Sequence, residues 1–353
     1  MSADVAMADA VTAPVVGEAT LWLDKHRPRE FEDILGNGTA VERLREAAAR
    51  RAIPDLVLYG RPGTGKTTAA RCMVARVLGT IRAGETAAIA AARVAVGHRY
   101  INASDVRSSA SLKAQIEAFL KMRVPELGRT DVRFVLLDEA DSMTKDAYTT
   151  LVDLMEKYHD SARFIIVCNN RNKLDPSVTT RCVDIHFAKI PDSDLRLLAI
   201  RVAREEALTV TADGLDSLVE LADGDARVVL NNMSLASMSS PVIDAAIVDQ
   251  ICEHAPPQLT RRLIQACLGG DLIDALAAVD VMIARGCSAR DIVHTCLKIL
   301  RLPSLEMSDL DRVAYLRLLS KTSRTVLDGL DTRLQILGLA AELYRYSAGC
   351  PAL

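Results

Sequence analysis

The chain has 353 residues, half of them hydrophobic, and its 43 Lys and Arg against 46 Asp and Glu give a net charge of -3. This length predicts two or three domains with enough apolar content for a sizeable core. The eight cysteines form no C-x-x-C pair and the six histidines are isolated, which argues against a zinc site or a disulfide framework. No hydrophobic run approaches the length that spans a membrane.

Residues 1–18 are rich in Ala and Val but lack a basic segment, so we expect a disordered leader and no signal peptide. Five short hydrophobic runs alternate with helical patterns further on, at 56–60, 99–102, 133–138, 163–168 and 183–187. This alternation predicts an α/β fold with a parallel sheet covered by helices on both faces. The Ala-rich segment 80–97 fits a longer helix or a surface insertion, and we favour the insertion.

The first hydrophobic run leads into a complete phosphate-binding loop. Residues 60–67 read Gly-Arg-Pro-Gly-Thr-Gly-Lys-Thr and match G-x-x-x-x-G-K-[ST] between a strand and a helix. Glycines let backbone N–H groups close around phosphate oxygens. Lys66 brings a charge to the β- and γ-phosphates, and the Thr67 hydroxyl is suited to ligate Mg²⁺. A Gly-rich turn without a ligand is the alternative, but strand, loop and helix all agree with a triphosphate site, formed by Gly60, Gly63, Thr64, Gly65, Lys66, Thr67 and Thr68.

An acidic pair follows the third hydrophobic run. Asp138 and Glu139 come directly after the buried pattern Phe134-Val-Leu-Leu137, and ligands bind at the carboxyl ends of parallel strands. Mg²⁺ keeps several waters and few carboxylates, so Asp138 suits its shell through water. Glu139 is placed to act as a general base on an attacking water. The alternative is that these carboxylates only cap the next helix, and we favour catalysis.

The strand patterns end at Pro191. Residues 192–206 have an amphipathic helical pattern, with Leu195, Leu198 and Val202 on one face. Two short helical patterns follow, and Pro256-Pro257 then breaks the chain. Five more helical patterns run from 259 to the end. We therefore expect a nucleotide-binding domain at 19–190, a small helical domain at 191–254 and an all-helical domain at 255–353.

Further motifs occur in order along the chain. Trp22-Leu-Asp-Lys25-His26-Arg27-Pro28 and Ile34-Leu35-Gly36-Asn37 resemble the W-x-x-K-Y-R-P and V-G-N segments of replication factor C small subunits, the AAA+ clamp-loader subunits. The other motifs similar to this family are Asn102-Ala-Ser104, Asp138-Glu-Ala-Asp-Ser-Met143, Met155-Glu156, Cys168-Asn169, Thr180-Arg181-Cys182, Gly224-Asp-Ala-Arg227 and Leu230-Asn-Asn232. The resemblance implies an AAA+ domain, then a helical lid at 191–254 and a helical oligomerisation collar at 255–353.

The resemblance also implies roles for residues outside the two nucleotide motifs. Asn169 would be the sensor that hydrogen-bonds the γ-phosphate or the attacking water, and Arg227 would reach the same nucleotide from the lid. An Asn could equally cap a turn, but the position of Asn169 at a strand end beside the strand of Glu139 favours the sensor. For Arg227, a solvated helix arginine is the competing interpretation. The adenine and ribose side of the pocket would be formed by Lys25, Arg27, Pro28, Ile34 and Leu35, a segment that otherwise reads as an ordinary loop packed on the sheet.

Thr180-Arg181-Cys182 resembles the family's Ser-Arg-Cys motif. The motif implies that Arg181 is an arginine finger that acts in trans on the ATP of a neighbouring subunit. A guanidinium stabilises charge on phosphoryl oxygens, and such a finger is worth about 10³–10⁵-fold in rate. The isolated chain should therefore be a poor ATPase even if it binds ATP well.

DNA contact, where the resemblance implies it, should go mostly to phosphates. Arg107 and Lys113 are the candidates, and each also fits a solvated surface charge. The chain departs from the family at Val152 and Asp153, where an Arg-Arg pair is usual, and His26 replaces a Tyr.

The function implied is that of an ATP-hydrolysing small subunit of a heteropentameric clamp loader in the nucleus, with ATP and Mg²⁺ as cofactors. Its partners would be the large subunit and sister small subunits, a sliding clamp and primer–template DNA, for replication and repair, with no membrane. Because the Arg-Arg pair is missing, an alternative function is that of a structural ring member that binds ATP without hydrolysing it. A small-molecule kinase is a third possibility, which the long helical C-terminal part disfavours.

Overall fold

The computed structural model describes residues 21–50, 53–80, 86–105, 108–122, 132–251, 255–301, 305 and 307–349. The chain divides into two compact units, Met1–Lys189 and Ile190–Leu353. The leader expected at 1–18 lies outside the described residues. Among the described residues, no helix is both long and apolar enough to cross a membrane.

The first unit contains a five-stranded sheet whose neighbouring strands all run parallel, in the order β2-β3-β4-β1-β5. The strands are β1 Leu56–Gly60, β2 His98–Asn102, β3 Arg133–Asp138, β4 Ala162–Cys168 and β5 Val183–Phe187. Each coincides with one of the five hydrophobic runs to within a residue, so the predicted parallel sheet is confirmed. Its central strands are buried on both faces, which is why their sequences do not alternate.

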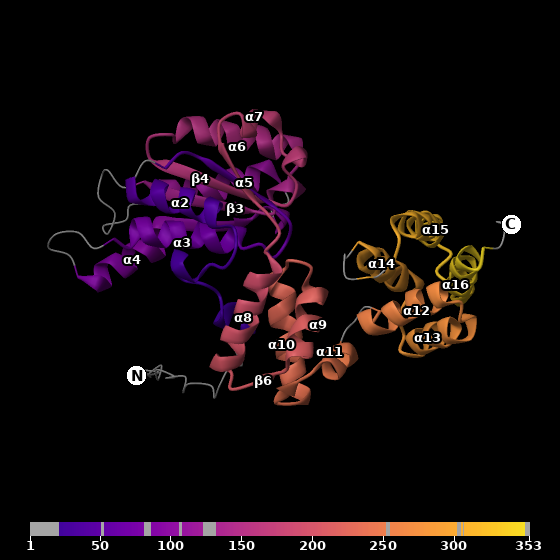
Figure 1. Ribbon diagram of the computed structural model, residues 1–353. Coiled ribbons are helices and arrows are strands. Elements are labelled where there is room, and N and C mark those ends of the chain that lie inside the picture. Colours follow the sequence, from indigo (N-terminus) through magenta and orange to yellow (C-terminus); the bar gives the residue numbers. More distant parts are fainter. Residues whose placement is uncertain are drawn as a thin grey trace, which may run out of the picture. The chain divides into compact units, whose positions relative to one another are not determined.

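Helices cover both faces of this sheet (Figure 1). The apolar side chains of α2 and α3 pack on one face, over alternate strand residues such as Leu136 and Val167. Those of α5 and α6 pack on the other face, over the intervening Val135 and Ile166. The helices of this unit are α1 Trp22–Lys25, α2 Gly38–Arg50, α3 Lys66–Leu78, α4 Ala87–Gly97, α5 Ser109–Lys121, α6 Lys145–Lys157 and α7 Pro176–Thr179, with short 3-10 turns η1 Phe31–Asp33, η2 Ala103–Asp105, η3 Ala140–Ser142 and η4 Arg171–Lys173.

Helix α4 corrects the surface insertion favoured for 80–97. Its described part is a capped helix: Thr86 caps the first turn by accepting from the Ile89 N–H, and Ala90 is buried. Arg93 is fully buried and donates hydrogen bonds of 2.6 Å to the Leu78 and Thr80 carbonyl oxygens at the end of α3. The segment is therefore part of the packed unit.

The second unit is almost entirely helical. Its elements are α8 Asp192–Glu205, β6 Thr209–Val210, α9 Ala212–Ala222, α10 Ala226–Ser239, β7 Val242–Ile243, α11 Ala245–Ile251, α12 Pro257–Gly269, α13 Leu272–Ala284, α14 Ala289–Leu300, α15 Asp309–Leu327 and α16 Arg333–Ser347. The predicted helix at 192–206 buries Leu195, Leu198 and Val202 as expected. The two-residue strands β6 and β7 are too short to leave a pattern in the sequence.

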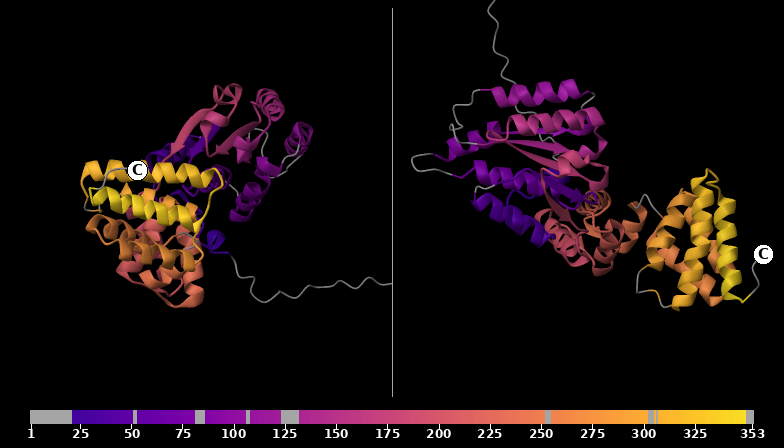
Figure 2. Two further views of the ribbon diagram at one scale, coloured as in Figure 1. Left: turned by 90° about the vertical axis from the view of Figure 1, so that its right-hand side faces the viewer. Right: turned by 90° about the horizontal axis from the view of Figure 1, so that it is seen from above.

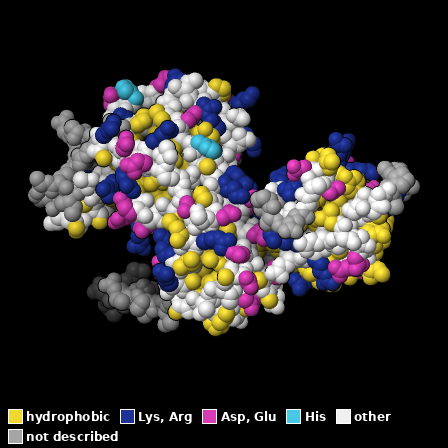
Figure 3. Space-filling model, in the orientation of Figure 1, with side chains coloured by type: hydrophobic (Ala, Val, Ile, Leu, Met, Phe, Trp, Pro, Cys, Tyr) yellow, Lys and Arg dark blue, Asp and Glu magenta, His cyan; other side chains and the backbone are white. Residues whose placement is uncertain are grey.

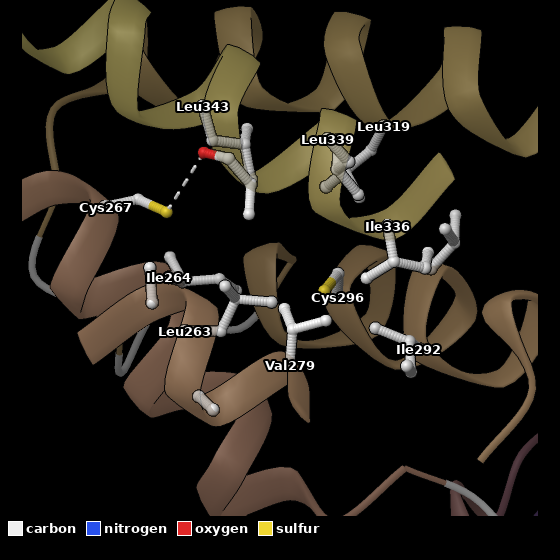
Figure 4. Close-up of a cluster of buried hydrophobic side chains, with 14 of the residues drawn as sticks. Leu263, Ile264, Cys267, Val279, Ile292, Cys296, Leu319, Ile336, Leu339 and Leu343 are labelled. Atoms are coloured by element: carbon white, nitrogen blue, oxygen red, sulfur yellow. Dashed lines mark hydrogen bonds between the residues drawn. The ribbon is translucent and has the colours of Figure 1, made fainter. Parts of the chain in front are cut away.

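The five C-terminal helices form a bundle (Figure 2). Its core consists of close-packed aliphatic side chains with two fully buried thiols, Cys267 and Cys296 (Figure 4). The Cys267 thiol lies 3.7 Å from the Ala340 carbonyl oxygen, to which it donates a weak hydrogen bond. These two cysteines are therefore packing residues of the bundle core.

Candidate nucleotide-binding site

The loop between β1 and α3 has a backbone that depends on glycine. Gly60 has φ +147, and a Cβ there would lie 2.0 Å from the Phe187 carbonyl oxygen of β5. Gly63 and Gly65 have φ values of +66 and +91, which L side chains rarely adopt. The loop ends at the first turn of α3, where backbone N–H groups lack partners within the helix and favour an anion. The Thr64 side chain turns inward and donates to the Arg61 carbonyl oxygen at 2.9 Å.

Lys66 begins α3 and its ammonium is held at this loop. The Nζ atom donates to the Gly60 and Arg61 carbonyl oxygens at 2.8 and 2.7 Å and to Asn169 Oδ1 at 3.1 Å. Asn169 directly follows β4, the parallel neighbour of β1. The sheet order thus brings together two predicted site residues that are 103 positions apart.

Thr67 and Asp138 also meet. The Thr67 hydroxyl donates to Asp138 Oδ2 at 2.9 Å, and the Glu139 backbone N–H donates to Asp138 Oδ1 at the same distance. A hydroxyl and a carboxylate converge here beside the phosphate loop, and Thr68 follows in the same helical turn. Both oxygen groups are hard donors that Mg²⁺ prefers, and among the described residues no cluster of three His, Cys, Asp or Glu offers a competing site. The donor set therefore fits Mg²⁺, which the Thr67 hydroxyl would hold directly and Asp138 through water.

Tyr100 is a third group on the same carboxylate, and it was not anticipated from the sequence. Its phenol donates to Asp138 Oδ2 at 2.9 Å, and the Arg71 guanidinium lies 4.8 Å from the ring centroid. Burial and the hydrogen bond to Asp138 raise the pKa of Tyr100 to about 12. Tyr100 lies two residues before Asn102 on β2, the strand that pairs with β3 and so with Asp138.

Glu139 lies directly beyond β3 and is exposed. Its backbone adopts the left-handed conformation, with φ +53 and ψ +36, which is rare for a residue with a side chain. The next turn, η3, is held in place by α6, because the buried Tyr148 of that helix donates to the Ala140 carbonyl oxygen at 2.6 Å. The strained backbone thus presents the Glu139 side chain at the edge of the sheet where Lys66 and Asp138 lie.

The segment expected beside the adenine and ribose packs on the same unit. Ile34 lies against the loop, since its Cγ2 atom is 4.0 Å from the position of a Cβ on Gly65. The Pro28 carbonyl oxygen accepts a weak hydrogen bond from the Cys72 thiol of α3, at 3.6 Å. Arg27 pairs with Asp24 at 2.8 Å. Of the other two residues expected here, Leu35 is half-buried and Lys25 is exposed.

Arg181 is exposed at the other end of the sheet from the phosphate loop. It lies two residues before β5, whereas the loop follows the carboxyl end of β1, with which β5 pairs from Leu56↔Val183 to Gly60↔Phe187. The Arg181 guanidinium forms an ion pair with Glu156 of α6 and donates to the Ser177 carbonyl oxygen at 3.1 Å. The structure therefore does not bring Arg181 to the chain's own Lys66 and Glu139.

Arg227, Lys113 and Arg107 are the other residues predicted from the sequence. Arg227 belongs to the second unit, where it is exposed in the first turn of α10 and its backbone N–H donates to Asp225 Oδ1 at 2.8 Å. Lys113 is exposed on α5. Arg107 lies outside the described residues.

Two protein-family models match this chain. Residues 56–189 match the model of the ATPase family associated with various cellular activities (AAA), and residues 255–342 match the replication factor C C-terminal domain. Replication factor C subunit 4 of Schizosaccharomyces pombe is 29% identical over 344 residues, which cover 96% of each chain. The replication factor C small subunit of Archaeoglobus fulgidus is also 29% identical, over 92% of this chain and 97% of the relative. Among solved structures, the Thermotoga maritima RuvB Holliday junction branch migration motor aligns over 68% of this chain and 78% of its own, with a TM-score of 0.49 and 16% identity.

Proposed function

Since the chain belongs to the replication factor C small-subunit family, we propose that it is an ATP-hydrolysing subunit of a heteropentameric clamp loader. In this proposal the assembly opens a sliding clamp and places it on primer–template DNA during replication and repair, in the nucleus. Its partners are the large subunit and sister small subunits, the clamp, and the phosphates of DNA.

One observation carries the hydrolytic part of the proposal. Lys66 with Asn169, and Thr67 with Asp138, form two hydrogen-bonded pairs at the edge of the sheet where the phosphate loop lies. An ATP-binding scaffold would need the first pair for the phosphates. Such a scaffold would need no general base, whereas Glu139 follows Asp138 on a strained turn at this edge of the sheet.

The roles follow from the donor and acceptor chemistry. The loop N–H groups and the Lys66 ammonium bind the β- and γ-phosphates, and the Asn169 amide orients the attacking water. Glu139 accepts a proton from that water as the general base. Thr67 and, through water, Asp138 would hold Mg²⁺, which would supply positive charge to the phosphates. Ile34 and Leu35 supply apolar contact for the base, beside Lys25, Arg27 and Pro28.

The site is completed by a neighbouring subunit in this proposal. Arg181 is exposed and remote from the chain's own phosphate loop, and it forms an ion pair with the exposed Glu156 carboxylate. Exposed ion pairs are worth at most about 1 kcal/mol, so a neighbour's triphosphate can replace Glu156 at little cost. Arg227, in the second unit, is proposed to contact the chain's own nucleotide and to couple its occupancy to movement of the lid.

The test measures ATP turnover of the reconstituted complex with clamp and primer–template DNA present. Each substitution is introduced into this chain alone. Glu139→Gln should abolish turnover at the chain's own site, and Arg181→Ala should lower turnover at the neighbour's site by about 10³-fold. Both variants should bind ATP as isolated chains, because neither removes a phosphate-loop contact. Co-purification followed by native mass spectrometry identifies the partner subunits. A fully active isolated chain carrying Arg181→Ala would refute completion of the site in trans.

A structural ring member that binds ATP without hydrolysing it remains the second candidate. Val152 packs against the core of the first unit and Asp153 is exposed, at the two positions where the family usually carries arginines. For such a subunit, Glu139→Gln would leave the turnover of the complex unchanged, while Lys66→Ala would still abolish ATP binding by this chain.

A further inference from the structure

Tyr100 lies beside the acidic pair but belongs to neither nucleotide motif. Residues of β2 and β3 that pair in register share a face of the sheet, and Tyr100 pairs with Leu136 while Asn102 pairs with Asp138. Tyr100 and Asp138 are therefore on the same face, two positions apart along the strands. The phenol spans that offset and donates to Asp138 Oδ2 at 2.9 Å.

The same carboxylate oxygen also accepts the Thr67 hydroxyl at 2.9 Å. A threonine hydroxyl can donate its proton to a carboxylate while a lone pair faces a cation. Asp138 therefore determines which way the Thr67 oxygen presents its lone pairs. Tyr100, in turn, determines the orientation of Asp138.

A second contact fixes the ring of Tyr100. The Arg71 guanidinium lies 4.8 Å from the ring centroid, in cation–π contact. Arg71 is four residues after Thr67 on α3, so the two side chains share one face of that helix. The helix thus reaches Asp138 twice, directly through Thr67 and indirectly through Arg71 and the tyrosine ring.

We propose that Tyr100 is a positioning residue for the magnesium site of this chain, acting through Asp138 and held in place by Arg71. The inference rests on the proposed nucleotide site and adds a residue to it. Partners that orient metal-site groups typically change metal affinity by about 10–100-fold when removed. Tyr100 should therefore affect how much Mg²⁺ is needed for ATP to bind, and leave metal-free ATP binding unchanged.

The experiment uses the isolated full-length chain and needs no partner subunits. The thermal midpoint is recorded at fixed ATP over a range of MgCl₂ concentrations, and ATP affinity is measured separately in EDTA. Tyr100→Phe removes only the hydroxyl and keeps the ring under Arg71. We expect it to raise the MgCl₂ concentration for half-maximal stabilisation about tenfold, with ATP affinity in EDTA unchanged. Arg71→Ala should raise the same MgCl₂ concentration roughly threefold, because the Tyr100 hydroxyl remains but the ring loses its cation–π contact.

Two further variants make the result specific. Tyr344→Phe, on α16 of the second unit, removes a phenol hydroxyl elsewhere and should match the wild type. In an Asp138→Asn background, Tyr100→Phe should cause no additional shift, because Tyr100 acts only through that carboxylate.

A Tyr100→Phe chain with the wild-type Mg²⁺ dependence would overturn the inference, as would one that loses ATP affinity in EDTA. Either result leaves the proposed function standing, provided that the wild-type chain responds to Mg²⁺ and ATP and that Lys66→Ala does not. A wild-type chain that binds no ATP would instead overturn the proposed function.

Discussion

Asp138 accepts hydrogen bonds from three separate parts of the chain: a helix start, a neighbouring strand and its own next residue. Such a carboxylate has little freedom to rotate, so its lone pairs have fixed directions before any ligand arrives. The contact to Thr67 could be predicted, because both residues belong to motifs with known spacing to phosphate. The contact to Tyr100 could not, because it depends on the register between β2 and β3, which no local pattern encodes.

Gly60 shows how one residue connects the sheet to the phosphate loop. Gly60→Ala should destabilise the chain by about 2 kcal/mol or more, since the new Cβ would lie 2.0 Å from the Phe187 carbonyl oxygen and the φ of +147 disfavours a side chain. Urea denaturation measures this loss, and ATP affinity should fall with it. Gly269→Ala is the matched control, because no heavy atom lies within 4 Å of its new Cβ. Equal stability of the two variants would contradict the constraint at Gly60.

At the scale of elements, the five parallel strands were predictable because their burial on both faces leaves uninterrupted hydrophobic runs. Helix α4 was not. Alanine dominates its sequence and gives no clear apolar stripe. Its one charged anchor, Arg93, looks like a surface residue until the carbonyl oxygens of Leu78 and Thr80, at and just after the end of α3, are placed beside it. The same holds for the short strands β6 and β7, whose pairing depends on the contact between distant segments.

Arg93 should therefore be a stability determinant of the first unit. Arg93→Met keeps much of the volume but removes the donors to the Leu78 and Thr80 carbonyl oxygens, and we expect a loss of about 2–4 kcal/mol in the free energy of unfolding. Arg93→Lys should recover part of it, because an ammonium can still donate to one carbonyl oxygen. Arg99→Met, at an exposed position of β2, serves as the control. An Arg93→Met chain as stable as this control would show that α4 is not anchored through the guanidinium.

At the scale of the whole molecule, both units enclose thiols. Burial raises the pKa of Cys72 to about 11 and those of Cys168, Cys267 and Cys296 to about 12. At pH 8 these groups are protonated and inaccessible, so iodoacetamide should label them in the native chain far more slowly than in urea. Labelling is read by mass spectrometry, peptide by peptide. As the pH rises towards 11, the native chain should still resist labelling by iodoacetamide. Rapid labelling of Cys267 or Cys296 in the native chain would contradict the packed core of the helical bundle.

The charge distribution bears on DNA binding. Lys and Arg side chains are interspersed with Asp and Glu on the face shown in Figure 3, in keeping with the net charge of -3. DNA contact on this face would therefore depend on a few separate positions. If Lys113 contacts a phosphate, Lys113→Ala in the assembled complex should weaken DNA binding similarly for all sequences and reduce the slope of log K against log salt by about 1. Lys145→Ala, at the exposed start of α6, is the comparison, and an unchanged slope for Lys113→Ala would remove that residue from the proposed interface.

Arg181 and the phosphate loop lie at opposite ends of the paired strands β1 and β5, so each copy of the chain has two different ends. The paired segment of β1 and β5 between them spans four residue steps, roughly 13 Å at 3.3 Å per residue, farther than an arginine can bend back to serve its own triphosphate. A subunit that supplies an arginine at one end and has its nucleotide site completed at the other would join its neighbours head to tail. If Arg181 acts in trans as proposed, an open assembly would contain one complete site fewer than it has subunits. The nucleotide site of one terminal subunit would then lack an arginine from a neighbour.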